Sequence, residues 1–205
     1  MRRDTPSRYL STSKKRMRCS HSGAARRINP SPGRRNMYLY VVRHAIAVEA
    51  GTPGYEDDSQ RILTGKGRKK MVKIAQGLRE LEERLDLILT SPYLRAVQTA
   101  KILKKVFHLK KDDVVETEHL TPMGYADQLI HEINKKYADL EKIALIGHEP
   151  SLSSLVSVLV AGEPDLSLTL KKGGVCRLSV GNLQYGRCAA LDWLLSPSQL
   201  VELSD

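Results

Sequence analysis

The sequence predicts an α/β protein with three layers, in which helices cover both sides of a mostly parallel, mixed sheet. Apolar runs at 38–42, 87–89 and 143–146 are typical of buried strands, and a stretch with helical periodicity follows each of them. Strands that alternate with helices favour layered α/β architecture. Two more strand-like runs, at 175–180 and 188–194, are separated by turn residues, so we expect an antiparallel pair at the end of the chain.

Helices are expected between and after the three parallel strands. The first begins after Thr64 as its N-cap, and its apolar stripe comprises Met71, Ala75, Leu78, Leu81 and Leu85. The second should begin with Ser91 as N-cap and Pro92 as the first helical residue, and should bury Ala96, Ala100, Leu103 and Phe107. A third is expected over 126–137 and a fourth from Ser151, with a short strand at 114–115 and a long loop at 50–60.

The whole net positive charge of the chain, +10, lies in its first 36 residues. This segment holds eleven Lys/Arg and one acid, so residues 37–205 hold 22 bases and 22 acids and are neutral. A segment rich in Arg, Ser and Pro with no hydrophobic periodicity is expected to be disordered. We consider three interpretations of residues 1–36: a transit peptide, a basic arm that contacts nucleic acid or an anionic surface, or an artefact of start-codon choice with Met37 as the true first residue. Residues 37–205 are expected to form the folded domain.

Several classes of protein are disfavoured by composition. The longest apolar stretch, 152–161, is interrupted by serines and is shorter than the roughly 18 residues that a membrane span needs. Cys19, Cys176 and Cys188 have neither CxxC nor zinc-ligand spacing, which indicates reduced thiols and a cytoplasmic protein, or an organellar one if residues 1–36 direct import. The sequence has no GxxxxGK[ST], GxGxxG or GxSxG motif, and no cofactor is expected.

Histidine and arginine follow three of the predicted strands directly. Arg43 and His44 follow the first strand, Arg95 lies just after the second, and His148 follows the third. Ligands bind at the carboxyl ends of parallel strands, so these side chains should converge if the strands are neighbours. A guanidinium group can bind two oxygens of one phosphate at once. Its positive charge also lowers the pKa of a nearby histidine, and the unprotonated ring nitrogen of that histidine can act as a nucleophile. Phosphoryl transfer without a metal ion is the chemistry that this set predicts.

These residues resemble the signature of the histidine phosphatase (phosphoglycerate mutase-like) superfamily. The matching blocks are 41–45 (VVRHA), 91–100 (SPYLRAVQTA) and 146–150 (IGHEP). Segments 63–64, 120–122 and 193–197 resemble the SixA-type protein phosphohistidine phosphatases, and the resemblance covers about residues 37–200. It implies a phosphoglycerate mutase-like fold and a two-step reaction. In that reaction His44 is transiently phosphorylated, Arg43, Arg95 and His148 hold the phosphoryl oxygens, and water releases phosphate.

The chain departs from the family pattern at two points. Ala45 stands where most members have glycine. No clear acid stands where larger relatives carry their proton donor; we name Glu118 and Asp127 as candidates, with Glu116, Glu49, Asp57 and Asp58 as rivals. A missing acid would hinder phosphate esters most, because an alkoxide leaves poorly, whereas phosphohistidine can be protonated at its other ring nitrogen. The absence therefore favours a P–N substrate and an open pocket.

The main hypothesis is a phosphohistidine phosphatase that acts on a phosphorelay or carrier protein, as a monomer. The alternative enzyme is a small-molecule phosphomonoesterase for a sugar phosphate or nucleotide. Such an enzyme would use cations beyond the main four, for which only Arg61 and Lys66 are candidates; we include Arg61 among the substrate-binding residues. A binding module that acts through residues 1–36 is the third hypothesis, and the neutral charge of residues 37–205 argues against it, and against a nucleic-acid partner.

Overall fold

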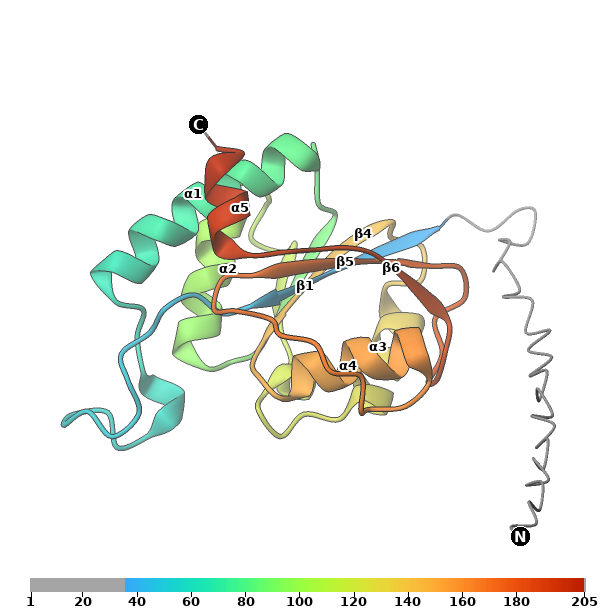
Figure 1. The fold of residues 1–205 in the computed structure, drawn as a ribbon, viewed down its shortest axis with the longest axis horizontal. Coiled ribbons are helices and arrows are strands. Elements are labelled where there is room, and N and C mark those ends of the chain that lie inside the picture. The colour runs from blue at the N-terminus through green and yellow to red at the C-terminus, as the bar shows by residue number, and fades with distance from the viewer. Residues whose placement is uncertain (1–35, 205) are drawn as a thin grey trace, which may run out of the picture.

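A six-stranded mixed sheet forms the centre of the computed structural model, which describes residues 36–204 (Figure 1). The strands are β1 (Met37–Arg43), β2 (Leu87–Thr90), β3 (Val114–Glu116), β4 (Lys142–Gly147), β5 (Val175–Val180) and β6 (Ala189–Leu195), in the order β3-β2-β4-β1-β5-β6. The first four are parallel, and β5 and β6 are antiparallel to their neighbours. The mostly parallel, mixed sheet and its antiparallel ending are confirmed. The interpretations of residues 1–35, and Cys19, lie outside the described residues.

Helices cover both sides of the sheet, as Figure 1 shows. On one side lie α1 (Gly65–Leu81), α2 (Leu94–Val106) and α5 (Pro197–Glu202), and on the other lie α3 (Ala126–Lys136) and α4 (Ser151–Ala161). Two short 3-10 helices, η1 (Asp58–Gln60) and η2 (Glu118–Leu120), lie in the connections. Within residues 36–204, none of the helices has the length and apolar character of a membrane span.

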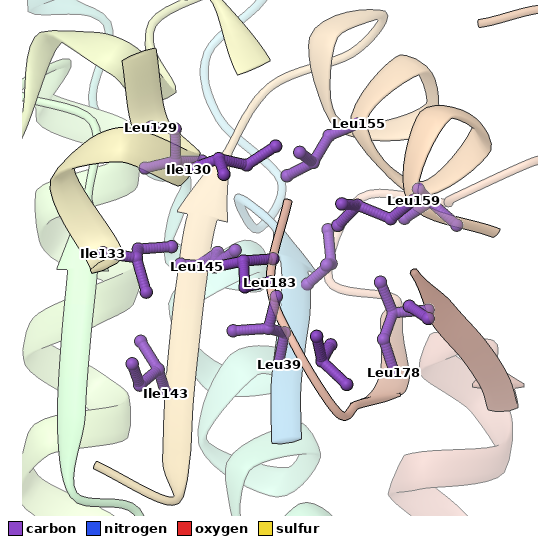
Figure 2. Close-up of a cluster of buried hydrophobic side chains, with 14 of the residues drawn as sticks. Leu39, Leu129, Ile130, Ile133, Ile143, Leu145, Leu155, Leu159, Leu178 and Leu183 are labelled. Atoms are coloured by element: carbon purple, nitrogen blue, oxygen red, sulfur yellow. The ribbon is translucent and has the colours of Figure 1, made fainter. Parts of the chain in front are cut away.

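Two hydrophobic cores follow from the alternation of side chains along the buried strands. In β1, Leu39 and Val41 belong to the core under α3 and α4, whereas Tyr40 and Val42 belong to the core under α1 and α2. Successive strand residues point to opposite faces, so a strand covered on both sides is apolar throughout. Figure 2 shows the first core, where leucines and isoleucines of α3 and α4 meet those of β1 and β4. Cys176 and Cys188 are free and buried, as predicted for reduced thiols.

Two local predictions need correction, and one helix was missed. Ser91 is not the N-cap of α2; Tyr93 holds that position, and Ser91 Oγ instead accepts a hydrogen bond from the Tyr93 backbone N–H at 3.2 Å. Leu81 is 43% exposed at the last position of α1, so it lies outside the apolar stripe, while Leu85 is buried beyond the helix. Helix α5 was not predicted, although Ser196 and Gln199 form its capping box.

The register of the parallel strands brings three strand ends together. Arg43 of β1 pairs with Gly147 of β4, and Ile146 of β4 pairs with Thr90 of β2. Residues that follow these strands, His44, Ser91 and His148, therefore lie side by side. Backbone hydrogen bonds continue the ladder past the strands, from His44 N–H to the Gly147 carbonyl (3.1 Å) and from Ser91 N–H to the Ile146 carbonyl (2.9 Å).

Close packing of α1 on α5 depends on Gly77. A Cβ at this position would lie 1.8 Å from the Leu200 carbonyl oxygen of α5. Alanine favours a helix over glycine by about 1 kcal/mol, but overpacking of a core costs about 1–3 kcal/mol, and here the clash is with backbone. We therefore expect Gly77→Ala to lower the free energy of unfolding by about 2 kcal/mol in urea denaturation.

Gly65 provides the matched control for this substitution. It is the first residue of α1, and a Cβ there would meet nothing within 4 Å. Gly65→Ala should change the free energy of unfolding by no more than about 0.5 kcal/mol. Equal effects of the two substitutions would contradict the packing argument.

Candidate active site

His44 presents one ring nitrogen that is free to react. The residue follows β1 directly and is 5% exposed. Its Nδ1 lies 2.7 Å from the Ala45 carbonyl oxygen, which can only accept, so Nδ1 carries the proton. Nε2 therefore keeps its lone pair, and Arg95 Nε donates a hydrogen bond to it at 3.3 Å. An unprotonated imidazole nitrogen of this kind is a competent nucleophile.

Arg95 lies in the first turn of α2 and is 3% exposed. The hydroxyl of Thr99, one turn later, donates to the Arg95 carbonyl at 2.7 Å and accepts from the Ala45 backbone N–H at 3.1 Å. The Tyr93 ring lies under the guanidinium, 5.0 Å from its central carbon. Thr99 therefore ties the start of α2 to the chain that follows His44, and this fixes the distance between the guanidinium and the imidazole.

His148 stands on the other side of His44, at the end of β4. The centroids of the two imidazole rings are 5.0 Å apart, and Tyr93 packs edge-on against His148 at 5.1 Å. His148 Nε2 lies 2.9 Å from the Ser91 hydroxyl, whereas the buried Nδ1 has no hydrogen-bond partner. A buried polar atom without a partner is unusual, and a phosphoryl oxygen bound next to His44 would give Nδ1 one.

Arg43 and the turn before β5 also lie beside His44. Arg43 Nη1 donates to the Leu170 carbonyl at 2.8 Å, and its buried Nε has no partner. The Gly173 backbone N–H donates to the carbonyls of both Arg43 and His44, at 3.0 and 3.2 Å. This turn also carries Lys172, whose charge acts on His44. Sequence reasoning missed Lys172, because its proximity to His44 depends on the pairing of β5 with β1.

The environment keeps both histidines neutral. The pKa of His44 is lowered to about 3, mainly by burial and also by the charges of Arg95 and Arg43, against the opposing effect of the hydrogen bond to the Ala45 carbonyl. Burial likewise lowers the pKa of His148 to about 3, with smaller effects of His44 and Arg95. The sequence predicted that arginine would lower the pKa of His44; burial is the larger cause. At neutral pH the His44 imidazole is therefore uncharged, although Arg95, Arg43 and Lys172 surround it with positive charge.

One carboxylate also reaches this cluster. Asp58, in η1 of the long loop, accepts a hydrogen bond from Arg95 Nη2 at 2.8 Å and from Arg61 Nε at 2.7 Å. Partial burial alone would raise the pKa of Asp58, but the hydrogen bonds and charges of Arg95 and Arg61 outweigh it and lower the pKa. Asp58 is thus an ionised acceptor at neutral pH. Arg61, predicted to bind substrate, is paired with Asp58 in this structure, and its Nη1 donates to the Val48 carbonyl at 2.8 Å.

The predicted proton donors lie outside the cluster. Glu118 is exposed in η2, and Asp127 is exposed in the first turn of α3. Within the described residues, neither side chain forms a hydrogen bond or ion pair with Arg43, His44, Arg95 or His148. Of the rivals, Glu116 and Glu49 are exposed, and Asp57 accepts from the Ser59 backbone N–H as the N-cap of η1. No three His, Cys, Asp or Glu side chains between residues 36 and 204 gather in a group that could hold a metal ion.

The two buried neutral histidines should make the fold sensitive to acid. Each has an ordinary pKa of 6.5 and a folded-state pKa of about 3. Between these values the unfolded chain binds more protons than the folded one, so the free energy of unfolding falls as the pH is lowered from about 6.5 toward 3. We expect urea unfolding to show a clear loss of stability between pH 7.5 and pH 4.5.

A double variant, His44→Asn with His148→Asn, isolates this contribution. Carboxylates such as Asp58, whose pKa is also lowered, act equally in both proteins. The double variant should therefore lose less stability than the wild type over the same pH interval. The same loss in both proteins would show that the histidines are not responsible.

Comparisons with known proteins agree on one family. The model of the histidine phosphatase superfamily (branch 1) matches residues 39–145. A protein of Picosynechococcus sp. is 34% identical over 80% of this chain and 99% of its own length. Phosphohistidine phosphatase SixA of Escherichia coli is 28% identical over 80% of this chain and 96% of its own length.

Solved structures share the fold at lower identity. The structure of the protein histidine phosphatase SixA complexed with tungstate is 23% identical, has a TM-score of 0.68, and matches over 80% of this chain and 99% of that one. Phosphatases of small molecules, such as mycobacterial glucosyl-3-phosphoglycerate phosphatase, have the same fold. The α/β architecture of this chain is therefore that of the histidine phosphatases, and the fold by itself does not select among their substrates.

Proposed function

This chain belongs to the histidine phosphatase superfamily and is a phosphatase, and from that premise we propose that it removes phosphate from histidine on a phosphorelay or carrier protein. In this proposal His44 is the nucleophile, Arg43, Arg95 and His148 hold the phosphoryl oxygens, and Arg61 and Lys172 add positive charge nearby. The enzyme acts in the cytoplasm, as a monomer, on a protein that presents its phosphohistidine at the ends of β1, β2 and β4.

The observation that carries the proposal is the pairing of the Asp58 carboxylate with two arginines. Asp58 is the one described carboxylate that contacts Arg95, and its hydrogen bonds from Arg95 and Arg61 keep it deprotonated. A phosphate ester needs an acid to protonate the alkoxide that leaves. Phosphohistidine does not need one in the site, because its leaving imidazole can carry a proton on the nitrogen remote from phosphorus. Among the described residues, the site combines a neutral histidine nucleophile with no protonated carboxylic acid. This combination suits cleavage of a P–N bond better than cleavage of a P–O bond.

The reaction follows from the positions of these groups. Nε2 of His44 attacks phosphorus, and the P–N bond of the substrate breaks with its electron pair moving to the leaving imidazole, which is protonated. Arg95 Nε already donates a hydrogen bond to Nε2 of His44, so the guanidinium is placed to donate to the phosphoryl oxygens as negative charge develops on them. His148 Nδ1 and Arg43 Nε, both buried and without partners, are further polar groups for those oxygens. Water then attacks phosphorus, the bond to His44 breaks, and phosphate leaves.

The named relatives support a protein substrate. Two of them carry the name phosphohistidine phosphatase SixA or its homologue, and this chain matches most of the length of each. The alternative, a small-molecule phosphomonoesterase, is favoured by the added charges of Arg61 and Lys172, which could bind a second anionic group. Arg61 is already occupied by Asp58, however, which reduces the weight of this argument.

A comparison of substrates tests the proposal. Phosphate release should be measured with a histidine-phosphorylated carrier protein, p-nitrophenyl phosphate and a sugar phosphate. We expect kcat/KM for the phosphoprotein to exceed that for the sugar phosphate by at least about 100-fold, a difference that needs only about 3 kcal/mol in the transition state. Faster turnover of the sugar phosphate would assign the chain to the small-molecule phosphatases and would require a proton donor.

A further inference from the structure

All three nitrogens of the Arg95 guanidinium donate a hydrogen bond in this structure. Nε donates to His44 Nε2 at 3.3 Å, Nη1 to the Asp58 backbone carbonyl at 2.6 Å, and Nη2 to the Asp58 carboxylate at 2.8 Å. The guanidinium is 3% exposed, so these bonds replace most of its contact with water. One loop residue, Asp58, thus accepts one hydrogen bond from each of Nη1 and Nη2.

The loop that supplies Asp58 has few other contacts with the body of the protein. Residues 49–61 project from the end of β1, as the blue-to-cyan segment of Figure 1 shows, and most of them are exposed. At the base, Val48 N–H donates to the Ile62 carbonyl at 2.9 Å, and Ala47 and Leu63 form an isolated bridge. Most hydrogen bonds beyond that base stay within the loop, such as those of Thr52 to Glu49. The hydrogen bonds between Asp58 and Arg95 therefore tie η1 of this loop to α2.

We propose that Asp58 is an internal substitute for the phosphoryl group, which binds Arg95 while the site is empty and is displaced when substrate arrives. A carboxylate and a phosphoryl group both offer anionic oxygens to a guanidinium, so the Asp58 carboxylate competes for Nη2, while Nη1 is bound by the Asp58 backbone carbonyl. This inference rests on the proposed function for the assignment of Arg95 to the phosphoryl site. Displacement would release η1 of the 49–61 loop from α2 and make Arg95 accessible to a protein side chain.

Arg61 makes this exchange feasible. It contacts the other carboxylate oxygen, Oδ1, through Nε at 2.7 Å and Nη2 at 2.5 Å, and it is fixed by its bond to the Val48 carbonyl. When a phosphoryl group takes Arg95, Asp58 keeps Arg61 as its partner and is not left as an unpaired charge. The bond of Arg61 to the Val48 carbonyl keeps this partner at the base of the loop while Asp58 exchanges Arg95 for solvent.

The test is the affinity of the protein for tungstate, measured by titration calorimetry on the full chain. Asp58→Asn removes the charge that competes for Arg95 and keeps the size of the side chain. We expect the variant to bind tungstate about tenfold more tightly, since hydrogen bonds to a charged partner are stronger than those to a neutral one. Amide exchange in residues 49–61 should be faster in the variant, and faster in the wild type when tungstate is bound.

Two further variants make the result decisive. Asp57→Asn is the matched control, because Asp57 is the adjacent acid and bonds only within η1; its tungstate affinity should equal that of the wild type. Arg95→Ala tests the site itself and should lose tungstate binding. If Arg95→Ala loses binding while Asp58→Asn binds as the wild type does, or more weakly, the competition is refuted and the site assignment stands. If Arg95→Ala still binds tungstate normally, the assignment of Arg95 to the phosphoryl site fails.

Discussion

Substitution of His44 by alanine is expected to lower kcat for phosphate release by at least about 1,000-fold, with every substrate. The His44 side chain is the attacking group. The neighbouring His148 cannot replace it, because the Nε2 atom of His148 is hydrogen-bonded to the Ser91 hydroxyl. Loss of a nucleophile removes a covalent route that the remaining groups cannot supply, although they still stabilise charge. The measurement is steady-state phosphate release from p-nitrophenyl phosphate and from a histidine-phosphorylated carrier protein.

His131→Ala is the matched control for that experiment. His131 is exposed on α3, away from the ends of the parallel strands, and the same substitution there should leave kcat unchanged. Retention of more than a tenth of the wild-type activity in His44→Ala would rule out His44 as the nucleophile, provided that the variant shows wild-type thermal unfolding.

The second large effect is expected at Arg95, where even lysine should fail. Arg95→Lys preserves the positive charge but offers one compact ammonium in place of three fixed nitrogens, which contact both His44 and Asp58 in the wild type. Loss of one preorganised donor to a developing charge costs about 100- to 1,000-fold in rate. We expect kcat/KM to fall by about 100-fold, as measured with p-nitrophenyl phosphate.

Arg68→Lys supplies the comparison for this substitution. Arg68 is exposed in the first turns of α1, where charge alone is sufficient, and its replacement should leave kcat/KM within about twofold of the wild type. An Arg95→Lys enzyme with wild-type activity would mean that the guanidinium geometry described above does not serve catalysis.

The parts of the fold that could be predicted are those in which local pattern and tertiary role coincide. Strands such as 143–146 are apolar throughout because both faces are covered, and the helix over 126–136 buries Leu129, Ile130 and Ile133 at helical spacing. His44 and His148 could be placed together because parallel strands end at one edge of the sheet. Each inference needed only the sequence period and a general rule of sheet topology.

The parts that could not be predicted depend on the path of the chain in space. Asp58 is one of several acids in a polar loop, and nothing local distinguishes it from Asp57; its contact with Arg95 joins residues 37 positions apart. Lys172 acts on His44 only because β5 returns beside β1. Ser91 was expected to cap α2 from a typical Ser-Pro start, but the helix begins at Leu94 and the Ser91 hydroxyl faces His148.

The central claim, that Nε2 of His44 carries the phosphoryl group during turnover, is tested most directly by locating that group. Wild-type enzyme should be quenched within the first turnover of a histidine-phosphorylated carrier protein, and the phosphorylated peptide and ring nitrogen identified by mass spectrometry and NMR. Because Nδ1 donates its hydrogen bond to the Ala45 carbonyl, we predict phosphate on Nε2 of His44. Phosphate on Nδ1, on His148 or on any other residue would contradict this prediction.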